Sequence, residues 1–568
     1  ITPFNWEIEF PEVFDRENPG FDAIVGNPPF LGGRRIKSSL GSEYSEWLPD
    51  AYPDASKNSD LSGFFFRRSF ALLRQKGSLG LIATNTIAQG DTRSSSLRFI
   101  SKNGGIIYNA RKRVRWPGLA SVMISIINIW KGDYQGMKFL DGIPTPQITA
   151  FLFSKGGNDD PEILRQNAGK GFIGSYILGS GFTFDDTDSN ASSIQDMKHL
   201  IEKEPRNSER IFPYIGGEEV NSSPNHANYR FAISFFDTSE EDSRQWPDLM
   251  EILELKVKPE RTRKNNKGDF VLRKPLPQRW WQYADKRPAL YKALATLEDR
   301  VLVRSLTSKY FCFTFLKNNF IYDQTLVVFA LSGFSSFCIV SSRLHEIWAV
   351  FFGATMKDDP RYNITKCFET FPFPGNWETD PTLEAVGKTY YEYRADLMVR
   401  NNQGLTDTYN RFHDPDERGP DILKLRDLHQ QMDAAVLNAY GWQDIATTCG
   451  FALDYLDADT DDLPPEAQDR IAIGDLFFPT PDEAAAFDSL VRTGKRKLPW
   501  RYRWPETTHD EVLARLLDLN QQRHLEEVRG HKAAGTLNKG KAKGDRTKKT
   551  SPKPQANAPT IPGLEIQD

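Results

Sequence analysis

Two consecutive prolines near the start of the chain limit most strongly what its first segment can form. Pro28 and Pro29 follow the run Phe21-Asp-Ala-Ile-Val25, a short apolar stretch typical of a buried strand. Proline has a fixed φ and no amide hydrogen, so two of them cannot continue a sheet ladder. The pattern predicts a strand that ends in a rigid loop, Asn27-Pro28-Pro29-Phe30, at the edge where open α/β sheets bind ligands.

Strand and helix patterns alternate around this loop. Helical spacing over 61–75 precedes apolar strands at 77–84, 105–108 and 121–130. This order predicts the C-terminal half of a doubly wound, Rossmann-like α/β sheet over residues 1–150. The expected fold class is α/β, with this partial sheet followed by an α+β domain and a helical C-terminal region.

The remaining residues divide by composition and pattern, and a chain of 568 residues is long enough for three or four domains. We expect a connector over 151–205, a mixed, aromatic-rich domain over 206–375 and a helical region over 376–529. The expected helices of that region are 382–400, 421–440 and 508–529, the last opening with a capping box of Thr508 and Glu511. Residues 530–568 are predicted to form a disordered basic tail.

Composition excludes several classes of protein. Lys plus Arg (72) and Asp plus Glu (76) nearly balance, so affinity for a polyanion must come from local patches. The four cysteines form no Cys-x-x-Cys pair and the eight histidines no i, i+4 pair, so no metal site is predicted, and a reducing cytoplasm fits best. The longest apolar run, 121–130, is too short for a membrane helix, and no secretory signal is visible.

The loop after the first strand suits methyl transfer to an amino group conjugated with an aromatic ring. Such an amine is a weak nucleophile, and acceptors that bind its two hydrogens return electron density to the nitrogen. The side-chain oxygen of Asn27 and the carbonyl of Pro28 are two such acceptors, and Phe30 would stack on a base that has left the duplex. An ordinary turn is the alternative, but the order of strand, loop, helix and Gly-led strand favours function.

These residues resemble the Asn/Asp-Pro-Pro-Phe/Tyr/Trp hallmark of amino-methylating, adenine-specific DNA methyltransferases. The chain is most similar to the large methylases of Type IIG and IIL restriction-modification enzymes, the MmeI-like group, and to the PglX methylase of BREX phage defence. The resemblance extends over about residues 1–375 and returns around 513–526. It is carried by the stretches 21–30, 80–93, 116–120, 213–221 and 279–282.

The resemblance implies S-adenosylmethionine as the cofactor and roles for two loops. Asn27, Pro28, Pro29 and Phe30 would grip the target adenine, with Asn27 also at the cofactor. A second set, with a helix cap as the alternative role, would shape the base pocket: Thr84, Asn85 and Gln89. Methylases of this group carry their Gly-rich cofactor loop before the Asn-Pro-Pro-Phe loop, and only 26 residues precede Asn27. We therefore expect a missing N-terminal half or a partner chain.

Two further motifs are weighed and set aside. Residues 169–174 match the Gly-x-Gly-x-x-Gly string of a cofactor loop, but they follow no convincing strand, and a surface turn is expected instead. Residues 247–256 imitate a nuclease pattern of carboxylates and lysine, but their apolar residues fall at helical spacing, which predicts an amphipathic helix.

A dense basic segment predicts contact with double-stranded DNA. Residues 256–279 include nine Lys and Arg but only two acidic residues, and two tryptophans follow directly. A solvated face is the alternative for the charges, and a buried core for the tryptophans. We expect 206–375 to be a target recognition domain whose DNA contacts include Lys264, Lys267, Arg273, Lys274, Arg279, Trp280 and Trp281.

The sequence thus predicts a site-specific, adenine-specific DNA methyltransferase of restriction-modification or phage defence, with defence-system subunits as further partners. One alternative is a DNA-specificity subunit without activity of its own, favoured by the missing cofactor loop. Another is methylation of RNA or of a protein amide, which about 400 residues beyond the core disfavour.

Overall fold

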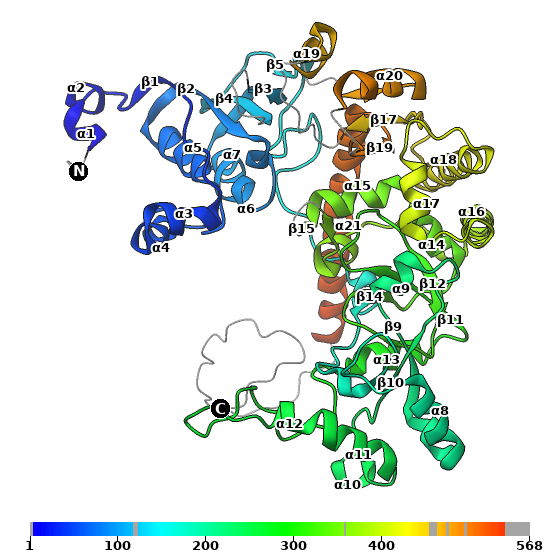
Figure 1. Cartoon of the computed structure of the whole chain (residues 1–568). Coiled ribbons are helices and arrows are strands. Elements are labelled where there is room, and N and C mark those ends of the chain that lie inside the picture. The colour runs from blue at the N-terminus through cyan, green and yellow to red at the C-terminus, as the bar shows by residue number, and fades with distance from the viewer. Residues whose placement is uncertain are drawn as a thin grey trace. The chain divides into compact units, whose positions relative to one another are not determined.

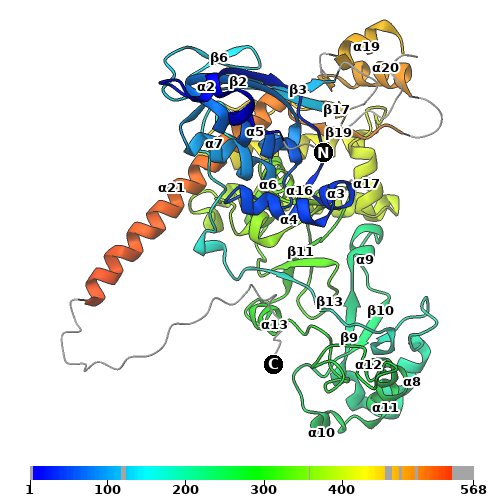
Figure 2. The same ribbon diagram turned by 90° about the vertical axis from the view of Figure 1, so that its left-hand side faces the viewer.

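The computed structural model describes residues 4–116, 123–356, 359–453, 463–472, 476–492 and 497–539. Its contacts divide the chain into two compact units (Figures 1 and 2). Unit 1 comprises 1–162, 413–417 and 444–523, and unit 2 comprises 163–412, 418–443 and 524–568. The domain boundaries expected from the sequence stay predictions, because this division follows contacts and crosses the helical region.

Unit 1 is built on a mixed six-stranded sheet in the order β1-β2-β4-β3-β5-β6. β1 runs parallel to β2, and β4 lies between β2 and β3, antiparallel to both. This arrangement confirms the predicted α/β class with a partial doubly wound sheet. The strands are β1 (Phe21–Gly26), β2 (Leu73–Thr84), β3 (Gly105–Arg115), β4 (Met123–Lys131), β5 (Lys138–Leu140) and β6 (Ile143–Thr145).

The boundary between the first long helix and β2 differs from the expected one. Helix α5 (Leu61–Leu72) begins as predicted, but it ends three residues before the predicted end at 75. Leu73 already pairs with Phe21 in the register of β1 and β2. The helix therefore stops where the chain joins the sheet, although its apolar spacing continues.

One face of this sheet is covered by helices. Helix α5 lies against it with α6 (Gly90–Arg93), the π-helical turn η2 (Ser94–Arg98) and α7 (Phe99–Lys102) (Figures 1 and 2). Alternate residues of β2 are buried on that face and only partly buried on the other. The shared core includes Phe66, Phe70, Leu79, Leu81, Ala83, Leu97, Ile100, Ile127 and Ile129.

The outer edge of β1 is open. Within the described residues β1 pairs only with β2 and ends the sheet. Asp22 and Ala23 are exposed, and Val25 is 87% exposed. An apolar residue in the middle of a strand is normally covered, so this edge and face present a surface that a further chain segment could bury.

Unit 1 also contains short N-terminal helices and a C-terminal subassembly. A small sheet in the order β18-β17-β19 lies within the region predicted as helical. Its bounds are β17 (Gly450–Leu453), β18 (Phe477–Phe478) and β19 (Trp500–Arg503). The helices are α1 (Trp6–Glu9), α2 (Pro11–Phe14), α3 (Gly33–Leu40), α4 (Ser42–Ala51), α19 (Pro465–Ala472), α20 (Pro481–Val491) and the first part of α21 (Glu506–Lys539).

Helix α21 corrects two expectations. It begins at Glu506, so Thr508 lies inside the first turn and the predicted capping box does not form. Glu511 pairs instead with Lys155 and Arg515, both through side chains. The helix continues to Lys539, so 530–539 is helical and not a disordered tail, and 540–568 lies outside the described residues.

Unit 2 contains two four-stranded sheets, in the orders β13-β9-β10-β8 and β12-β11-β14-β7. β7 and β8 belong to the segment 151–205 predicted as a connector, so residues 163–205 of that segment are part of the folded unit 2. The stretch 169–174 begins with a turn at Gly169, as expected, but its residues 171–173 form β7. The strands are β7 (Gly171–Ile173), β8 (Thr183–Phe184), β9 (Ile211–Ile215), β10 (Arg230–Ile233), β11 (Arg300–Ser305), β12 (Thr314–Lys317), β13 (Ile321–Tyr322) and β14 (Leu326–Phe329), with the separate pair β15 (Ala354–Met356) and β16 (Asp359–Arg361).

The helices of unit 2 include three that the sequence predicted. α11 confirms the helix over 247–256, and α16 and α18 confirm those over 382–400 and 421–440. Besides the end of α21, the described residues of unit 2 form α8 (Ile194–Lys203), α9 (Gly217–Ser222), α10 (Glu240–Ser243), α11 (Pro247–Lys256), α12 (Lys258–Arg261), α13 (Pro288–Leu294), α14 (Phe334–Ser341), α15 (Arg343–Phe352), α16 (Pro381–Asn401), α17 (Leu405–Phe412) and α18 (Pro420–Tyr440). In the part of the chain that the structure describes, no helix combines the length and apolar character needed to cross a bilayer.

Candidate functional site

Two polar loops leave the same edge of the unit 1 sheet. Asn27-Pro28-Pro29-Phe30 follows β1 directly and has no regular structure, with Asn27 and Pro29 exposed, Pro28 buried and Phe30 partly buried. The second loop, 84–89, follows β2. Because β1 and β2 are parallel with Gly26 opposite Leu81, the carboxyl ends of both strands meet at one edge. The structure therefore brings the predicted catalytic loop beside Thr84, Asn85 and Gln89.

Charged contacts hold the start of β1 in register. Arg74 Nε lies 2.7 Å from Asp22 Oδ1, and Arg16 Nη2 lies 3.0 Å from Asp22 Oδ2. These hydrogen bonds, from Arg74 first and then Arg16, hold the pKa of Asp22 below its usual range. Gly20 has φ +111°, and a Cβ there would lie 2.5 Å from the backbone nitrogen of Arg74. The strand that carries the Asn27 loop is thus fixed to β2 at its beginning.

The downstream end of the Asn27 loop is also anchored. The Leu61 amide donates to the Leu31 carbonyl at 2.9 Å. Gly33 packs so closely on the backbone of Asn58 that a Cβ would lie 2.3 Å from its carbonyl carbon. Beneath these contacts α3, α4 and the start of α5 share a small core of Ile36, Leu48, Leu61 and Phe64. A loop held on both sides keeps its acceptors in place before any ligand binds.

Asn85 is fixed by two donors. Its Oδ1 accepts a hydrogen bond from the Arg113 amide at 3.3 Å and one from Ser125 Oγ at 3.0 Å. A backbone N–H can only donate, so the oxygen of the Asn85 amide must face Arg113 and its NH₂ group points away from these partners. Asn85 opens the 3₁₀ turn η1 (Asn85–Ala88), for which Thr84 makes no side-chain cap. The helix-cap alternative is therefore not what the structure shows for Thr84.

Thr84, Thr86 and Gln89 supply further polar side chains of this loop, whereas Ile87 and Ala88 are buried. Thr84 Oγ1 lies 2.7 Å from Thr86 Oγ1. Gln89 is exposed, its amide donates to the Thr86 carbonyl and its own carbonyl accepts from the Arg93 amide. The loop thus offers a hydroxyl pair and a glutamine side chain at the edge that Asn27 occupies.

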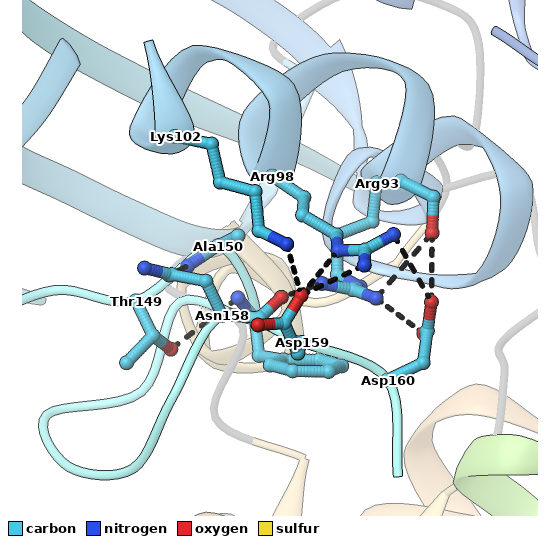
Figure 3. Close-up of polar contacts among 10 residues, drawn as sticks. Arg93, Arg98, Lys102, Thr149, Ala150, Asn158, Asp159 and Asp160 are labelled. Atoms are coloured by element: carbon cyan, nitrogen blue, oxygen red, sulfur yellow. Dashed lines mark hydrogen bonds and ion pairs between the residues drawn. The ribbon is translucent and has the colours of Figure 1, made fainter. Parts of the chain in front are cut away.

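Arg93 ties the segment after this loop to residues 149–160 (Figure 3). Its side chain is fully buried, and its guanidinium carbon lies 3.8 Å from the centroid of the Phe151 ring. Arg93 Nη1 donates to the Asn158 carbonyl at 2.6 Å, and Nη2 pairs with the Asp160 carboxylate. Arg93 therefore anchors α6, the helix that follows Gln89, to residues 149–160.

A second carboxylate, Asp159, also connects this helical segment to residues 149–160. Asp159 Oδ1 lies 2.7 Å from Arg98 Nη2 and 2.6 Å from Lys102 Nζ, as Figure 3 shows. Burial alone would raise the pKa of Asp159, but hydrogen bonds from Lys102 and Arg98 outweigh it and lower the pKa. The sequence did not single out Asp159 or Asp160, because their partners lie about 60 positions away and no local pattern marks them.

The basic segment lies in unit 2 and forms a hairpin-like loop. The Asn265 amide donates to the Asp269 carbonyl at 2.8 Å, and the Val271 amide donates to the Arg263 carbonyl at 2.9 Å. Below the loop the buried Arg261 donates to the Ile177 carbonyl at 2.7 Å. The cations predicted to contact DNA are all exposed on this loop or just after it: Lys264, Lys267, Arg273, Lys274 and Arg279.

Trp280 and Trp281 correct the prediction of base stacking. They are only 4% and 7% exposed and belong to the core of unit 2. Trp281 Nε1 donates to the Thr238 carbonyl at 3.1 Å, and Lys258 Nζ lies 4.6 Å from the centroid of the Trp280 ring. Both rings are therefore occupied by packing, which is the core alternative, and only the charged residues of the prediction remain available to DNA.

Two of the other motifs add no residue to the candidate site. In the stretch 213–221 the buried Glu219 accepts from Arg230 at 2.7 Å and from the Gly216 amide at 3.0 Å, which is an internal brace. In the stretch 116–120 residues 117–120 lie outside the described residues. Among the described side chains no cluster of three or more His, Cys, Asp or Glu has the geometry of a metal site.

Two protein families match separate segments of this chain. The family of the Eco57I restriction-modification methylase matches residues 1–108, and the MmeI target recognition domain matches residues 179–375. The first match contains β1, β2 and both polar loops, and the second contains most strands of the unit 2 sheets and the basic loop. Residues 1–108 are therefore similar to a restriction-modification methylase, and residues 179–375 are similar to the MmeI target recognition domain.

Individual relatives are also DNA methyltransferases or restriction-modification enzymes by name. DNA methyltransferase A of Bacillus subtilis (strain 168) is 22% identical over 452 residues, which are 76% of this chain and 47% of that protein. The Type II restriction enzyme and methyltransferase RM.Eco57I of Escherichia coli is 31% identical over 90 residues, 16% of this chain and 9% of that protein. The chain thus spans about half of the first relative and a small part of the second.

Solved structures of restriction-modification enzymes are also similar. The Type IIL enzyme MmeI in complex with DNA is 18% identical, with a TM-score of 0.47 over 82% of this chain and 57% of that one. The Type IIG restriction endonuclease BpuSI is 12% identical, with a TM-score of 0.27 over 74% of this chain and 54% of that one.

Proposed function

We propose that this chain is the catalytic-loop, target-recognition and C-terminal part of a DNA methyltransferase of restriction-modification or phage defence. In this proposal the methyl group goes to the exocyclic amino group of an adenine that has left the duplex. The observation that carries it is the anchored Asn27-Pro28-Pro29-Phe30 loop, set at the same sheet edge as Thr84–Gln89. The family matches over 1–108 and 179–375 support the two halves of the assignment.

The chemistry assigned to the loop needs two acceptors and one apolar surface. Asn27 Oδ1 and the Pro28 carbonyl accept the two hydrogens of the amine, which keeps the nitrogen lone pair available for attack. Phe30 stacks on the base, and rigid anchoring at Leu31 and Gly33 limits the motion of both acceptors. The amine loses its proton after the new bond forms, so no strong base is required beside it.

S-adenosylmethionine is the methyl donor of this proposal, and when bound it supplies a methyl group on a positively charged sulfur. The proposal assigns to Asn27 a contact with this donor at the sheet edge. The open edge of β1, where Val25 is 87% exposed, supports a missing neighbour for this side of the sheet. We infer that an N-terminal half or a partner chain covers this edge and supplies the Gly-rich cofactor loop.

One rival function has a specific observation in its favour. A chain whose first strand lacks its neighbour could serve only to recognise DNA, as a specificity subunit. Such a subunit would bind DNA without transferring methyl groups even when its partner is present. Methylation of RNA or of a protein amide is the other alternative, since the same loop suits those amines.

Substrate competition separates these functions. The chain, together with the N-terminal half that supplies the cofactor loop, is given labelled S-adenosylmethionine and unmethylated duplex DNA, and RNA or protein is added in excess. The proposal predicts label in N6-methyladenine of the DNA, in an amount that excess RNA or protein does not reduce. Label recovered in RNA or protein would contradict it.

Neutralising the exposed basic loop is expected to weaken DNA binding. Lys264→Gln combined with Arg273→Gln removes two phosphate contacts, which lowers the affinity and reduces the slope of log K against log salt by about 2. The measurement is a fluorescence-anisotropy titration of duplex DNA at several salt concentrations. As a control, Lys388→Gln removes an exposed charge on α16 that pairs with Glu392. Equal slopes for the loop variant and the control would contradict DNA contact by these cations and would indicate that they are only exposed to solvent.

A further inference from the structure

Arg113 lies in an irregular part of β3 that touches the loop of Asn85. The pairing of β3 with β4 shifts between Arg111 and Val114, and Arg113 has φ 54°. This left-handed conformation is rare for an arginine and persists only where surrounding contacts hold it. The Arg113 amide is one of the two donors that fix Asn85 Oδ1.

The contacts that hold Arg113 come from the start of α21. Arg113 Nη2 lies 2.9 Å from Glu506 Oε2 and 3.5 Å from Asp510 Oδ1. Arg503 Nη2 lies 2.7 Å from the other oxygen of Glu506, and Lys112 Nζ pairs with Asp510. Two carboxylates on successive turns of one helix thus neutralise the two cations of the β3 bulge.

This cluster is partly shielded from water. The side chains of Lys112 and Asp510 are 9% and 20% exposed, and those of Arg113 and Glu506 are 40% and 38% exposed. Burial alone would raise the pKa of Glu506, but the charges of Arg503 and Arg113 outweigh it and hold the pKa well below its usual range. Ion pairs with limited exposure restrict geometry more than pairs in open solvent do. The cluster is therefore suited to fix the backbone at Arg113.

We propose that Glu506 and Asp510 are positioning residues for the target-base pocket, acting through the Arg113 bulge on the orientation of Asn85. The inference rests on the proposed function, because it assigns Asn85 to that pocket. With its oxygen held by Arg113 and Ser125, Asn85 presents its NH₂ group, which donates to a ring nitrogen of the base. Adenine has an acceptor at N1, where guanine has an N–H, so the orientation favours adenine.

The test compares two carboxylate replacements on the same helix. Glu506→Gln with Asp510→Asn removes both charges from Arg113 and keeps the side-chain shapes. Glu511→Gln is the matched control, because Glu511 pairs with Lys155 and Arg515 and not with β3. Each full-length variant is assayed with the supplied N-terminal half for kcat and for the KM of target DNA, and alone for amide hydrogen exchange and melting temperature.

We expect the double variant to lose about 10-fold or more in kcat at an unchanged KM for DNA, because misplaced pocket groups slow the reaction without removing phosphate contacts. Hydrogen exchange should rise in peptides spanning 85–93 and 105–116, while Glu511→Gln behaves as the unmodified chain. Equal effects of the two variants, or losses that follow the melting temperature alone, would overturn the inference.

A second variant guards against failure to fold. Arg113→Lys keeps the positive charge beside Glu506 and is expected to retain more kcat than Arg113→Ala at a similar melting temperature. Equal kcat values for these two variants would also overturn the inference. If the unmodified chain transfers no methyl group, the proposed function has failed, and the hydrogen-exchange comparison still decides the link between α21 and Asn85.

Discussion

Asn27→Ala is expected to reduce methyl transfer by about 10²–10³-fold, because it removes one of two acceptors that act on the developing charge of the amine. DNA affinity should stay unchanged, since Asn27 lies in the unit 1 loop and the basic DNA segment lies in unit 2. The measurement pairs single-turnover transfer of labelled methyl with an anisotropy titration of the same duplex.

Two further variants make this result specific. Asn27→Asp keeps an acceptor oxygen and should retain measurable transfer. Asn103→Ala removes an exposed amide that caps α7 before β3, at the opposite edge of the sheet, and should leave transfer unchanged. Equal loss of transfer and of DNA binding in Asn27→Ala would contradict a role in the chemistry.

Asp433→Ala is expected to lower the free energy of unfolding of unit 2 by about 3–5 kcal/mol, because it leaves a buried arginine without its counter-charge. Asp433 is fully buried, accepts from the Arg343 amide at 2.8 Å and pairs with the Arg343 guanidinium. His429 Nδ1 lies 3.3 Å from the same carboxylate. Urea unfolding followed by tryptophan fluorescence measures the change.

A surface pair on the same helix is the control. Lys424 Nζ lies 3.0 Å from Asp427 on α18, and both side chains are half exposed. Asp427→Ala should change stability by less than about 1 kcal/mol. Similar losses of unfolding free energy in the two variants would show that burial of the Asp433–Arg343 pair does not increase its contribution to stability.

The same pair predicts a direction of pH dependence. Burial would raise the pKa of Asp433, but the charges of Arg343 and His429 outweigh it and place the pKa below the ordinary value of 3.8. A lowered folded-state pKa stabilises the fold fully above the unfolded value, and this contribution is lost as the pH falls through the folded value. The stability difference between the unmodified chain and Asp433→Asn should therefore shrink in acid.

The parts of the site that the sequence predicted are local in sequence. The strand before Asn27 follows from its apolar run, and the loop follows from Pro28 and Pro29, which no ladder accepts. The end of α5 was not predictable in this way, since helical spacing continues past Leu72 and only the pairing of Leu73 with Phe21 ends the helix. Tertiary pairing overrode a local pattern.

The parts that the sequence could not predict depend on distant partners. Trp280 and Trp281 follow a basic run, as stacking residues would, but the backbone of Thr238 and the unit 2 core bury them. The Lys112–Asp510 contact joins residues 398 positions apart. No spacing rule links such residues, so the cluster around Arg113 becomes visible only in the folded chain.

The most direct test of methyl transfer by this chain uses labelled S-adenosylmethionine and unmethylated duplex DNA. The chain is assayed alone and then with an N-terminal half that covers the open edge of β1 and carries the cofactor loop. We predict transfer to adenine only after supplementation, and its loss in Asn27→Ala. DNA binding without any transfer in the supplemented sample would contradict the proposed activity and favour a specificity subunit.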